Sequence, residues 1–200
     1  MIDALVLAAG YGTRMGQVKA LTTIDGEPFL SRIIGRLRQA GLDRPIVVLG
    51  HESDSVLEAI DLSACRVVTN PDPGRGLSSS LLLGIQAVDA RASGVLVLHA
   101  DMPMVASETT RAVAETAEMG AHLAAPLYHG KRGFPVYLSR TSFSELHDSL
   151  DGDTGARDYI ARHSDDLVLV DVDDPGCILD IDTPEDLAHV RRSSRCATSA

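Results

Sequence analysis

Short apolar runs alternate along this chain with segments of helical spacing, and this alternation restricts the fold more than any other feature. Several runs, such as GVLVLH at 94–99, are hydrophobic at successive positions, which is typical of strands buried on both faces. Alternation of strands and helices with short connections favours parallel pairing and right-handed crossovers. We predict strands at residues 4–8, 45–49, 66–69, 94–99, 123–125 and 167–172.

The segments between these runs carry the periodicity of amphipathic helices. In the first of them, Leu30, Ile33, Ile34 and Leu37 fall on one face. The fold class that we predict is therefore a three-layer α/β/α sandwich with a mostly parallel, Rossmann-like sheet. We expect one domain over residues 1–192 and a disordered tail over 193–200. The predicted helices are residues 29–40, 53–60, 78–90, 108–119, 141–150, 155–163 and 184–192.

Composition excludes several classes of function. The 200 residues carry a formal net charge of -10, which argues against general binding to nucleic acid or to anionic membranes, because both require a basic face. No apolar run approaches the length of about 20 residues that a membrane helix needs. The three cysteines, Cys65, Cys177 and Cys196, lie too far apart for a zinc motif or a disulfide framework. We expect a cytoplasmic protein.

A glycine-rich segment, LVLAAGYGTRMGQVK, follows the first predicted strand directly. Gly10, Gly12 and Gly16 permit tight turns and a close approach of backbone N–H groups to phosphate oxygens, while Arg14 and Lys19 supply positive charge. In a doubly wound sheet, ligands bind beyond the carboxyl ends of the strands. The spacing matches neither GxxxxGK[ST] nor GxGxxG. The segment therefore predicts a phosphate-binding loop of another kind.

Two further strand or strand-like ends carry aspartates. Asp101 follows the apolar run VLVLHA, where it could serve a metal or merely a turn. Asp180 and Asp182 alternate after another short apolar run, so only one of them can face a given side. Mg²⁺ is commonly held by one or two carboxylates together with substrate phosphates. Thr183, before Pro184, is typical of a helix N-cap.

Other polar and basic residues allow two interpretations each. Asn70, Gly76 and the three serines at 78–80 could bind a nucleobase, although a serine there could also cap the following helix. His99, two residues before Asp101, could orient the carboxylate or the substrate, or could be a buried core histidine. Surface charge is the alternative to anion binding for four basic residues next to glycines: Arg75, Lys131, Arg132 and Arg157.

Six segments, in order, resemble the motifs of the MobA-like nucleotidyltransferases, a family that includes molybdenum cofactor cytidylyltransferases. The resemblance covers nearly the whole chain and ends near Arg192. The segments are LAAGYGTRMG at 7–16, NPDPGRGLSSS at 70–80, HADMP at 99–103, PLYHGKRGFPV at 126–136, GDTGAR at 152–157 and DIDTPEDL at 180–187.

The resemblance implies roles for individual residues. It implies catalytic roles for Arg14, Lys19 and Asp101, and a Mg²⁺ site at Asp101 and Asp182. The nucleotide would be bound by Ala8, Ala9, Gly10, Gly12, Thr13, Arg14, Lys19, Asn70, Gly76, Ser78, Ser79 and Ser80. The second substrate would be bound by His99, Lys131, Arg132, Gly133, Asp153 and Arg157.

The expected reaction is attack by a phosphate of a small molecule on the α-phosphorus of CTP, with release of pyrophosphate. A phosphate monoester is already ionised near neutral pH, so positioning and charge neutralisation suffice. The Ala8-Ala9-Gly10 start is similar to the cytidylyl branch of the family, which favours CTP over GTP. The resemblance implies a molybdopterin-type acceptor carrying molybdenum, with a molybdoenzyme as a client.

Three alternatives to this function stay open. One is transfer of GMP from GTP to the same cofactor, and another is nucleotidyl transfer to a different phosphorylated small molecule, such as a sugar phosphate. The third is a molybdenum cofactor-binding chaperone without catalytic activity. The co-occurrence of Lys19, Arg14, Asp101 and Asp182 argues against the chaperone, because a carrier needs neither a clamp for a leaving group nor metal carboxylates.

Overall fold

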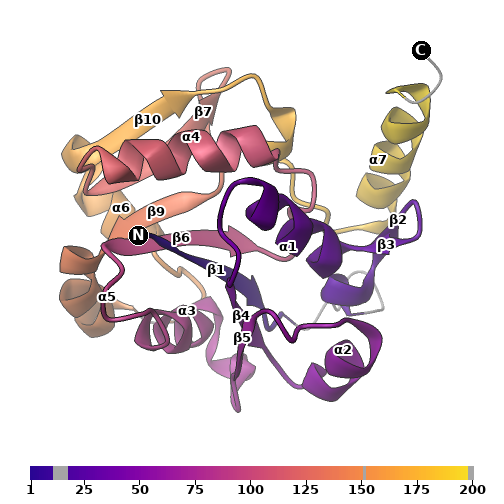
Figure 1. Cartoon of the computed structure of the whole chain (residues 1–200), viewed down its shortest axis with the longest axis horizontal. Helices are drawn as coiled ribbons and strands as arrows, with labels where there is room; N and C mark the ends of the chain where they lie inside the picture. Colours follow the sequence, from indigo (N-terminus) through magenta and orange to yellow (C-terminus); the bar gives the residue numbers. More distant parts are fainter. Residues whose placement is uncertain (11–17, 151, 198–200) are drawn as a thin grey trace.

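An eight-stranded mixed sheet forms the centre of the molecule (Figure 1), in a computed structural model that describes residues 1–10, 18–150 and 152–197. The strand order is β10-β7-β9-β6-β1-β4-β5, and β8 pairs with β7. The strands are β1 (Asp3–Ala8), β4 (Ile46–Leu49), β5 (Arg66–Thr69), β6 (Gly94–His99), β7 (Leu123–Tyr128), β8 (Lys131–Arg132), β9 (Val136–Ser139) and β10 (Leu167–Asp171).

Helices cover both faces of the sheet and confirm the predicted three-layer α/β/α sandwich. In the described part of the chain, α1 (Phe29–Gln39), α2 (Ser53–Ala59) and α4 (Ser107–Glu118) pack on one face. The other face is covered by α3 (Leu77–Gln86), α5 (Phe143–Ser149) and α6 (Arg157–Arg162). None of the described helices combines the length and the apolar character needed to cross a membrane.

Burial on both faces explains the continuous apolar runs. In β1, Ala4 and Val6 belong to the core cluster under α1, whereas Leu5 and Leu7 belong to the cluster under α3. This strand lies between β6 and β4, parallel to both, with Val6 opposite Leu98 and Val47. Side chains in the interior of such a strand meet a helix layer on either face, so these positions are apolar, and the one acid of β1, Asp3, stands at its first position.

The sheet contains an antiparallel strand, β9, that the sequence prediction missed. It is buried along its four residues and pairs with both β6 and β7. Its shortness and its start directly after Phe134-Pro135 conceal it in the sequence. The turn suggested by Gly130 and Gly133 is a hairpin: His129 and Gly130 both have positive φ, and β8 runs antiparallel to β7.

Element ends differ from the predictions by a few residues. Helix α3 begins at Leu77 and ends at Gln86, four residues before the predicted end at 90. The apolar run at 177–179 is not a strand end: Pro175–Ile178 form a 3-10 helix, whose first turn is capped by the Asp174 side chain accepting a hydrogen bond from the Gly176 N–H. In β7, pairing with β10 continues through Pro126 to Leu127, past the predicted end at 125.

The C-terminal helix α7 (Pro184–Ala197) packs against the short hairpin of β2 (Thr23–Ile24) and β3 (Glu27–Pro28). Ile24, Phe29, Ile181, Leu187 and Val190 form a separate buried cluster there. As predicted, Thr183 caps this helix: its hydroxyl accepts from the Asp186 N–H and donates to the Asp186 carboxylate. The helix continues to Ala197, beyond the expected end near Arg192.

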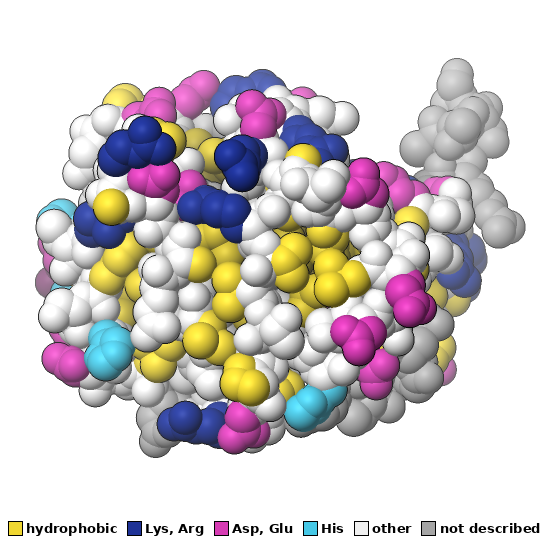
Figure 2. Space-filling model, turned by 60° about the horizontal axis from the view of Figure 1, so that its bottom comes forward, with side chains coloured by type: hydrophobic (Ala, Val, Ile, Leu, Met, Phe, Trp, Pro, Cys, Tyr) yellow, Lys and Arg dark blue, Asp and Glu magenta, His cyan; other side chains and the backbone are white. Residues whose placement is uncertain are grey.

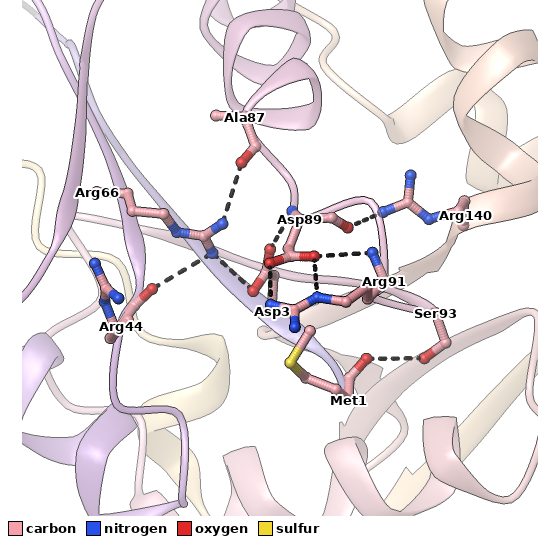
Figure 3. Close-up of polar contacts among 9 residues, drawn as sticks. All are labelled: Met1, Asp3, Arg44, Arg66, Ala87, Asp89, Arg91, Ser93 and Arg140. Atoms are coloured by element: carbon pink, nitrogen blue, oxygen red, sulfur yellow. Dashed lines mark hydrogen bonds and ion pairs between the residues drawn. The ribbon is translucent and has the colours of Figure 1, made fainter.

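A polar network closes the amino ends of the strands (Figure 3). Asp3, at the start of β1, forms an ion pair with Arg66 at 2.7 Å and accepts a hydrogen bond from the Asp89 N–H at 2.8 Å. Arg140 donates to the carbonyl oxygen of Ala92 at 2.6 Å. These groups tie four chain segments together at the end of the sheet opposite Ala8, Ala9 and Gly10.

Candidate active site

A cavity of about 660 Å³ lies at the carboxyl ends of the central strands. Ala8, Ala9 and Gly10 reach it from the end of β1, and Asp101 reaches it from the loop after β6. Because β1 and β6 are parallel neighbours, their carboxyl ends deliver these residues to one edge. The sequence-based expectation that the glycine-rich start and Asp101 share a cleft is therefore met for the described residues.

Lys19 joins the two predicted metal carboxylates. Its Nζ atom donates to Oδ2 of Asp101 at 3.0 Å and to Oδ1 of Asp182. These carboxylates stand 82 and 163 positions away from Lys19 along the chain. All three side chains are partly buried, with 20–29% of their surface exposed. The early cation and the two late acids thus meet at one point of the cleft.

Burial and charge act in opposite directions on Lys19. Burial lowers the pKa of its ammonium group, but the hydrogen bonds and charges of Asp182 and Asp101 outweigh burial and hold the pKa above its ordinary value. Lys19 therefore stays charged at neutral pH. It balances one of the two negative charges of the pair, which leaves the cluster with a net charge of about -1.

His99, the last residue of β6, lies between this cleft and a neighbouring one. Its ring meets the edge of Phe134 at a centroid distance of 4.6 Å. Burial lowers the pKa of His99, although the charge of Asp101 opposes this. His99 therefore combines features of both interpretations of the sequence, because its ring packs against Phe134 and it also lines the cleft beside Asp101.

The loop before α3 contributes Gly76 and Ser80 to the cavity. Gly76 has φ of 92°, and a Cβ atom there would lie 2.5 Å from the backbone carbonyl of Gly152. The Ser78 N–H donates to the Gly152 carbonyl oxygen at 3.0 Å, and the Leu77 N–H donates to Asp153 at 3.2 Å. This close contact of two backbones requires glycine, and it brings the GDTGAR segment to the cavity wall.

Three other residues predicted to bind the nucleotide lie elsewhere. Asn70 donates to the hydroxyls of Ser79 and Ser80, each at 2.9 Å, and its side-chain oxygen accepts from the Asp72 N–H. Asn70, Ser78 and Ser79 line a separate recess of about 250 Å³, together with Arg75. The Asn70 side chain thus braces its own loop. No serine caps α3, whose N-cap is Gly76.

A second cavity of about 470 Å³ adjoins the first and shares His99, Asp101 and Arg157 with it. Predicted substrate residues gather there: His99, Lys131, Arg132, Gly133 and Arg157, whereas Asp153 lines the first cavity. Gly12, Thr13 and Arg14 lie outside the described residues.

The second cavity also contains residues that the sequence analysis missed. Asp180, to which the sequence analysis gave no role in binding, lines this cavity, while Asp182 lines the first, as alternation predicts. Phe134, Met102 and Cys177 complete much of its apolar wall. Apolar side chains carry no signal that separates a cavity wall from core. A Cβ atom on Gly133 would lie 2.3 Å from the Cys177 carbonyl oxygen, so the wall closes only with glycine there.

Charged side chains are unevenly distributed over the surface. Figure 2 shows one face, on which hydrophobic side chains are exposed between a group of Lys and Arg side chains, with some Asp and Glu side chains among them, and a group of Asp and Glu side chains.

The carboxylate pair suits a divalent metal that binds few protein ligands. One ammonium nitrogen contacts both Asp101 and Asp182, so both carboxylates reach a common point. Among the described residues, no group of three or more His, Cys, Asp and Glu side chains is arranged to hold a metal. Two carboxylates completed by phosphate oxygens and water fit Mg²⁺ or Mn²⁺, and do not fit a structural zinc site.

Comparison with known proteins identifies the family. The model of the MobA-like NTP transferase domain matches residues 4–167, which include the sheet from the second residue of β1 to the first residue of β10. The chain belongs to the MobA-like NTP transferase family. It is accordingly a nucleotidyltransferase, and its relatives with solved structures share the mostly parallel sheet flanked by helices.

Full-length relatives carry different names. Molybdenum cofactor cytidylyltransferase of Escherichia coli K12 is 28% identical over 92% of this chain and 93% of its own. Nicotine blue oxidoreductase of Paenarthrobacter nicotinovorans is 25% identical over 93% and 94%. By contrast, this chain spans only 25% of bifunctional protein GlmU from Heliobacterium modesticaldum, with 33% identity over 117 residues.

Solved structures give the same picture. Rv0371c from Mycobacterium tuberculosis H37Rv superimposes with a TM-score of 0.83 at 31% identity, over 96% of this chain and 98% of Rv0371c. Rv0371c has also been solved as a complex with manganese. A divalent metal thus binds a relative of similar length and fold.

Proposed function

We propose that this protein is a divalent-metal-dependent cytidylyltransferase that transfers CMP from CTP to the phosphate of a molybdopterin-type acceptor and releases pyrophosphate. The observation that carries the proposal is the contact of Lys19 with both Asp101 and Asp182, at the junction of two cavities. A site for phosphoryl chemistry needs cations and metal-binding acids at one point.

The two cavities suit two substrates. The first, bounded by Ala8–Gly10 and the loop before α3, receives the nucleotide, and its phosphates lie near Lys19. The second, with Arg132 and Lys131 at its hairpin and Phe134 in its wall, receives the acceptor. Arg157 lines both cavities, and there it neutralises charge where the two anionic substrates approach each other.

The chain's own residues position the reactants and balance their charge. Mg²⁺ or Mn²⁺ held by Asp101 and Asp182, when bound, would neutralise phosphate charge and polarise the phosphorus. The acceptor phosphate is already ionised near neutral pH, so the reaction requires no protein base to create the nucleophile. His99, whose lowered pKa keeps it neutral, adds no positive charge and orients groups between the cavities.

The choice of CTP is supported by the Ala8-Ala9-Gly10 start and by the full-length similarity to the E. coli cytidylyltransferase. Pyrophosphate release would be measured with purified protein, molybdenum cofactor, Mg²⁺ and either CTP or GTP. We expect release with CTP that depends on the cofactor. Release of pyrophosphate with GTP but not with CTP would overturn the choice of base. Binding of the cofactor without pyrophosphate release from either nucleotide would favour the non-catalytic chaperone.

Variants link this activity to the site. Lys19→Gln and Asp101→Asn are expected to lower turnover by about a hundredfold or more, because each removes charge stabilisation at the reacting phosphates. Asp171→Asn, at an exposed position on β10, removes the same charge as Asp101→Asn and is the matched control. Equal turnover in Asp101→Asn and Asp171→Asn would overturn the proposed site.

A further inference from the structure

Lys19 holds a position that a divalent metal needs. Its Nζ atom contacts one oxygen of each carboxylate in the pair, Oδ2 of Asp101 and Oδ1 of Asp182. A metal bound to the same two side chains would stand close to this ammonium group. Repulsion between unit charges about 4 Å apart in a partly buried site changes an equilibrium constant by more than a factor of ten.

In the nucleotide-free protein, the described residues give a metal at the Asp101–Asp182 pair few further ligands. No third acidic, histidine or cysteine side chain among the described residues joins Asp101 and Asp182 in a metal-binding group. Mg²⁺ sites with one or two carboxylates depend on substrate phosphates for further ligands. Without nucleotide, an ammonium group already in place competes with a metal that lacks most of its ligands.

The side chain at this position is suited to withdrawal. Lys19 is the first residue of a 3-10 turn whose backbone is held by the hydrogen bonds from the Leu21 and Thr22 N–H groups to the Val18 carbonyl oxygen. Lysine carries a compact charge on a flexible stem, whereas arginine presents a rigid fork. Lys19 also lines the first cavity, together with Gly10. Rotation of the Lys19 side chain alone, without movement of its backbone, would turn Nζ from the acids toward a phosphate bound in that cavity.

We propose that Lys19 and the divalent metal occupy the Asp101–Asp182 pair in turn: lysine holds the two acids in the nucleotide-free protein, and the nucleotide's phosphates draw it away, so that metal and nucleotide bind together. The inference rests on the proposed function, which supplies the nucleotide and the metal. It adds that Lys19 opposes metal binding before it serves the phosphates. Metal and nucleotide must then strengthen each other's binding by the same factor.

Binding of Mn²⁺ to the full-length, nucleotide-free protein, followed by electron paramagnetic resonance, tests the proposal without any turnover. We expect Lys19→Met to bind Mn²⁺ about tenfold or more tightly than the unmodified protein. Arg44→Met is the matched control, since Arg44 is an exposed cation just before β4 and lines neither cavity. This variant carries the same charge change and is expected to bind Mn²⁺ like the unmodified protein.

Two further measurements locate the effect. Lys19→Met combined with Asp101→Asn is expected to lose the gain, which places the tighter binding at the acid pair. A non-hydrolysable CTP analogue should strengthen Mn²⁺ binding to the unmodified protein, and should do so less in Lys19→Met. Melting with and without Mn²⁺ checks that the variant folds, and the rise in Tm on adding Mn²⁺ should be larger in Lys19→Met.

Equal or weaker Mn²⁺ binding by Lys19→Met would overturn the competition, as would an equal gain in Arg44→Met. Such results would leave the proposed transfer reaction intact, provided that Asp101→Asn still abolished release of pyrophosphate from CTP. Conversely, a reaction unaffected by Asp101→Asn would refute the proposed function, whatever the Mn²⁺ titration gave. The two failures are therefore distinguishable.

Discussion

The backbone N–H of Ile181 donates a hydrogen bond to the carbonyl oxygen of Asp101 at 2.8 Å. This bond joins the loop after β6 to the segment before α7, and Ile181 itself is fully buried against Phe29 and Leu187. The next residue, Asp182, is thereby brought to the side chain of Lys19, to which Asp101 also binds. One backbone contact between distant segments thus assembles the acid pair.

Asp182 and Asp180 should separate in their effects, because alternation aims them at different cavities. Asp182→Asn is expected to lower kcat by about a hundredfold or more, since it removes one of the two carboxylates that we propose to hold the metal. Asp180→Asn is expected to change mainly the KM for the acceptor. Steady-state kinetics with each substrate varied in turn would check this, and equal losses of kcat in both variants would contradict the assignment.

Asp174 should be among the polar residues most important for stability. Its buried carboxylate accepts hydrogen bonds from the Ala106 N–H at 2.9 Å, the Thr109 hydroxyl at 2.7 Å and the Gly176 N–H at 2.9 Å. Asp174→Ala leaves these donors without that acceptor and is expected to lower the free energy of unfolding by about 3 kcal/mol. Urea denaturation would measure the change.

A graded series controls for the role of Asp174. Thr109→Val removes one of the three donors and is expected to cost about 1 kcal/mol. Asp171→Asn, on the exposed position of β10, should stay within about 0.5 kcal/mol of the unmodified protein. If Asp174→Ala were no more destabilising than Asp171→Asn, the three hydrogen bonds would not contribute as the structure implies.

Glycine at 133 should be required for the shape of the second cavity. Gly133→Ala places a Cβ atom against the Cys177 carbonyl, which accepts a hydrogen bond from the Phe134 N–H at 2.8 Å. We expect a loss of about 1–3 kcal/mol in unfolding free energy and a higher acceptor KM, with the Kd for CTP unchanged. Calorimetric titration would measure the Kd for CTP, and steady-state kinetics would measure the KM for the acceptor.

A helical glycine provides the matched control for Gly133. Gly35 lies inside α1, and nothing stands within 4 Å of the Cβ atom that alanine would add. Gly35→Ala is therefore expected to stabilise the protein by about 0.5–1 kcal/mol, because alanine favours the helix. Comparable destabilisation by both substitutions would mean that the contact with Cys177 is not the cause.

Stability should fall in alkaline solution in a way that depends on Cys177. Burial raises the pKa of this thiol to about 11, above the ordinary value of 9.0. A group whose pKa is raised by folding contributes stability that is complete below pH 9 and is lost as the pH rises toward 11. The Tm of Cys177→Ala should fall less between pH 9 and 11 than the Tm of the unmodified protein, once the difference between their Tm values at pH 8 has been subtracted.

Local patterns in the sequence determined most of the sheet and the positions of the candidate residues along the chain. Continuous apolar runs identified strands such as β1 and β6, because burial on both faces leaves a residue-by-residue signature. The glycines after β1 and the aspartate after β6 then followed from the rule that parallel strands present ligand-binding loops at their carboxyl ends.

Only the tertiary structure decided which distant groups meet. The antiparallel β9 fills the place between β6 and β7, and its four residues carry no periodicity long enough to reveal it. Asn70 turns to the hydroxyls of its own loop, where its donors are satisfied by Ser79 and Ser80. Lys19 meets Asp182 across 163 positions of chain. Such contacts depend on the path of the whole backbone, whereas periodicity records only whether each residue is buried.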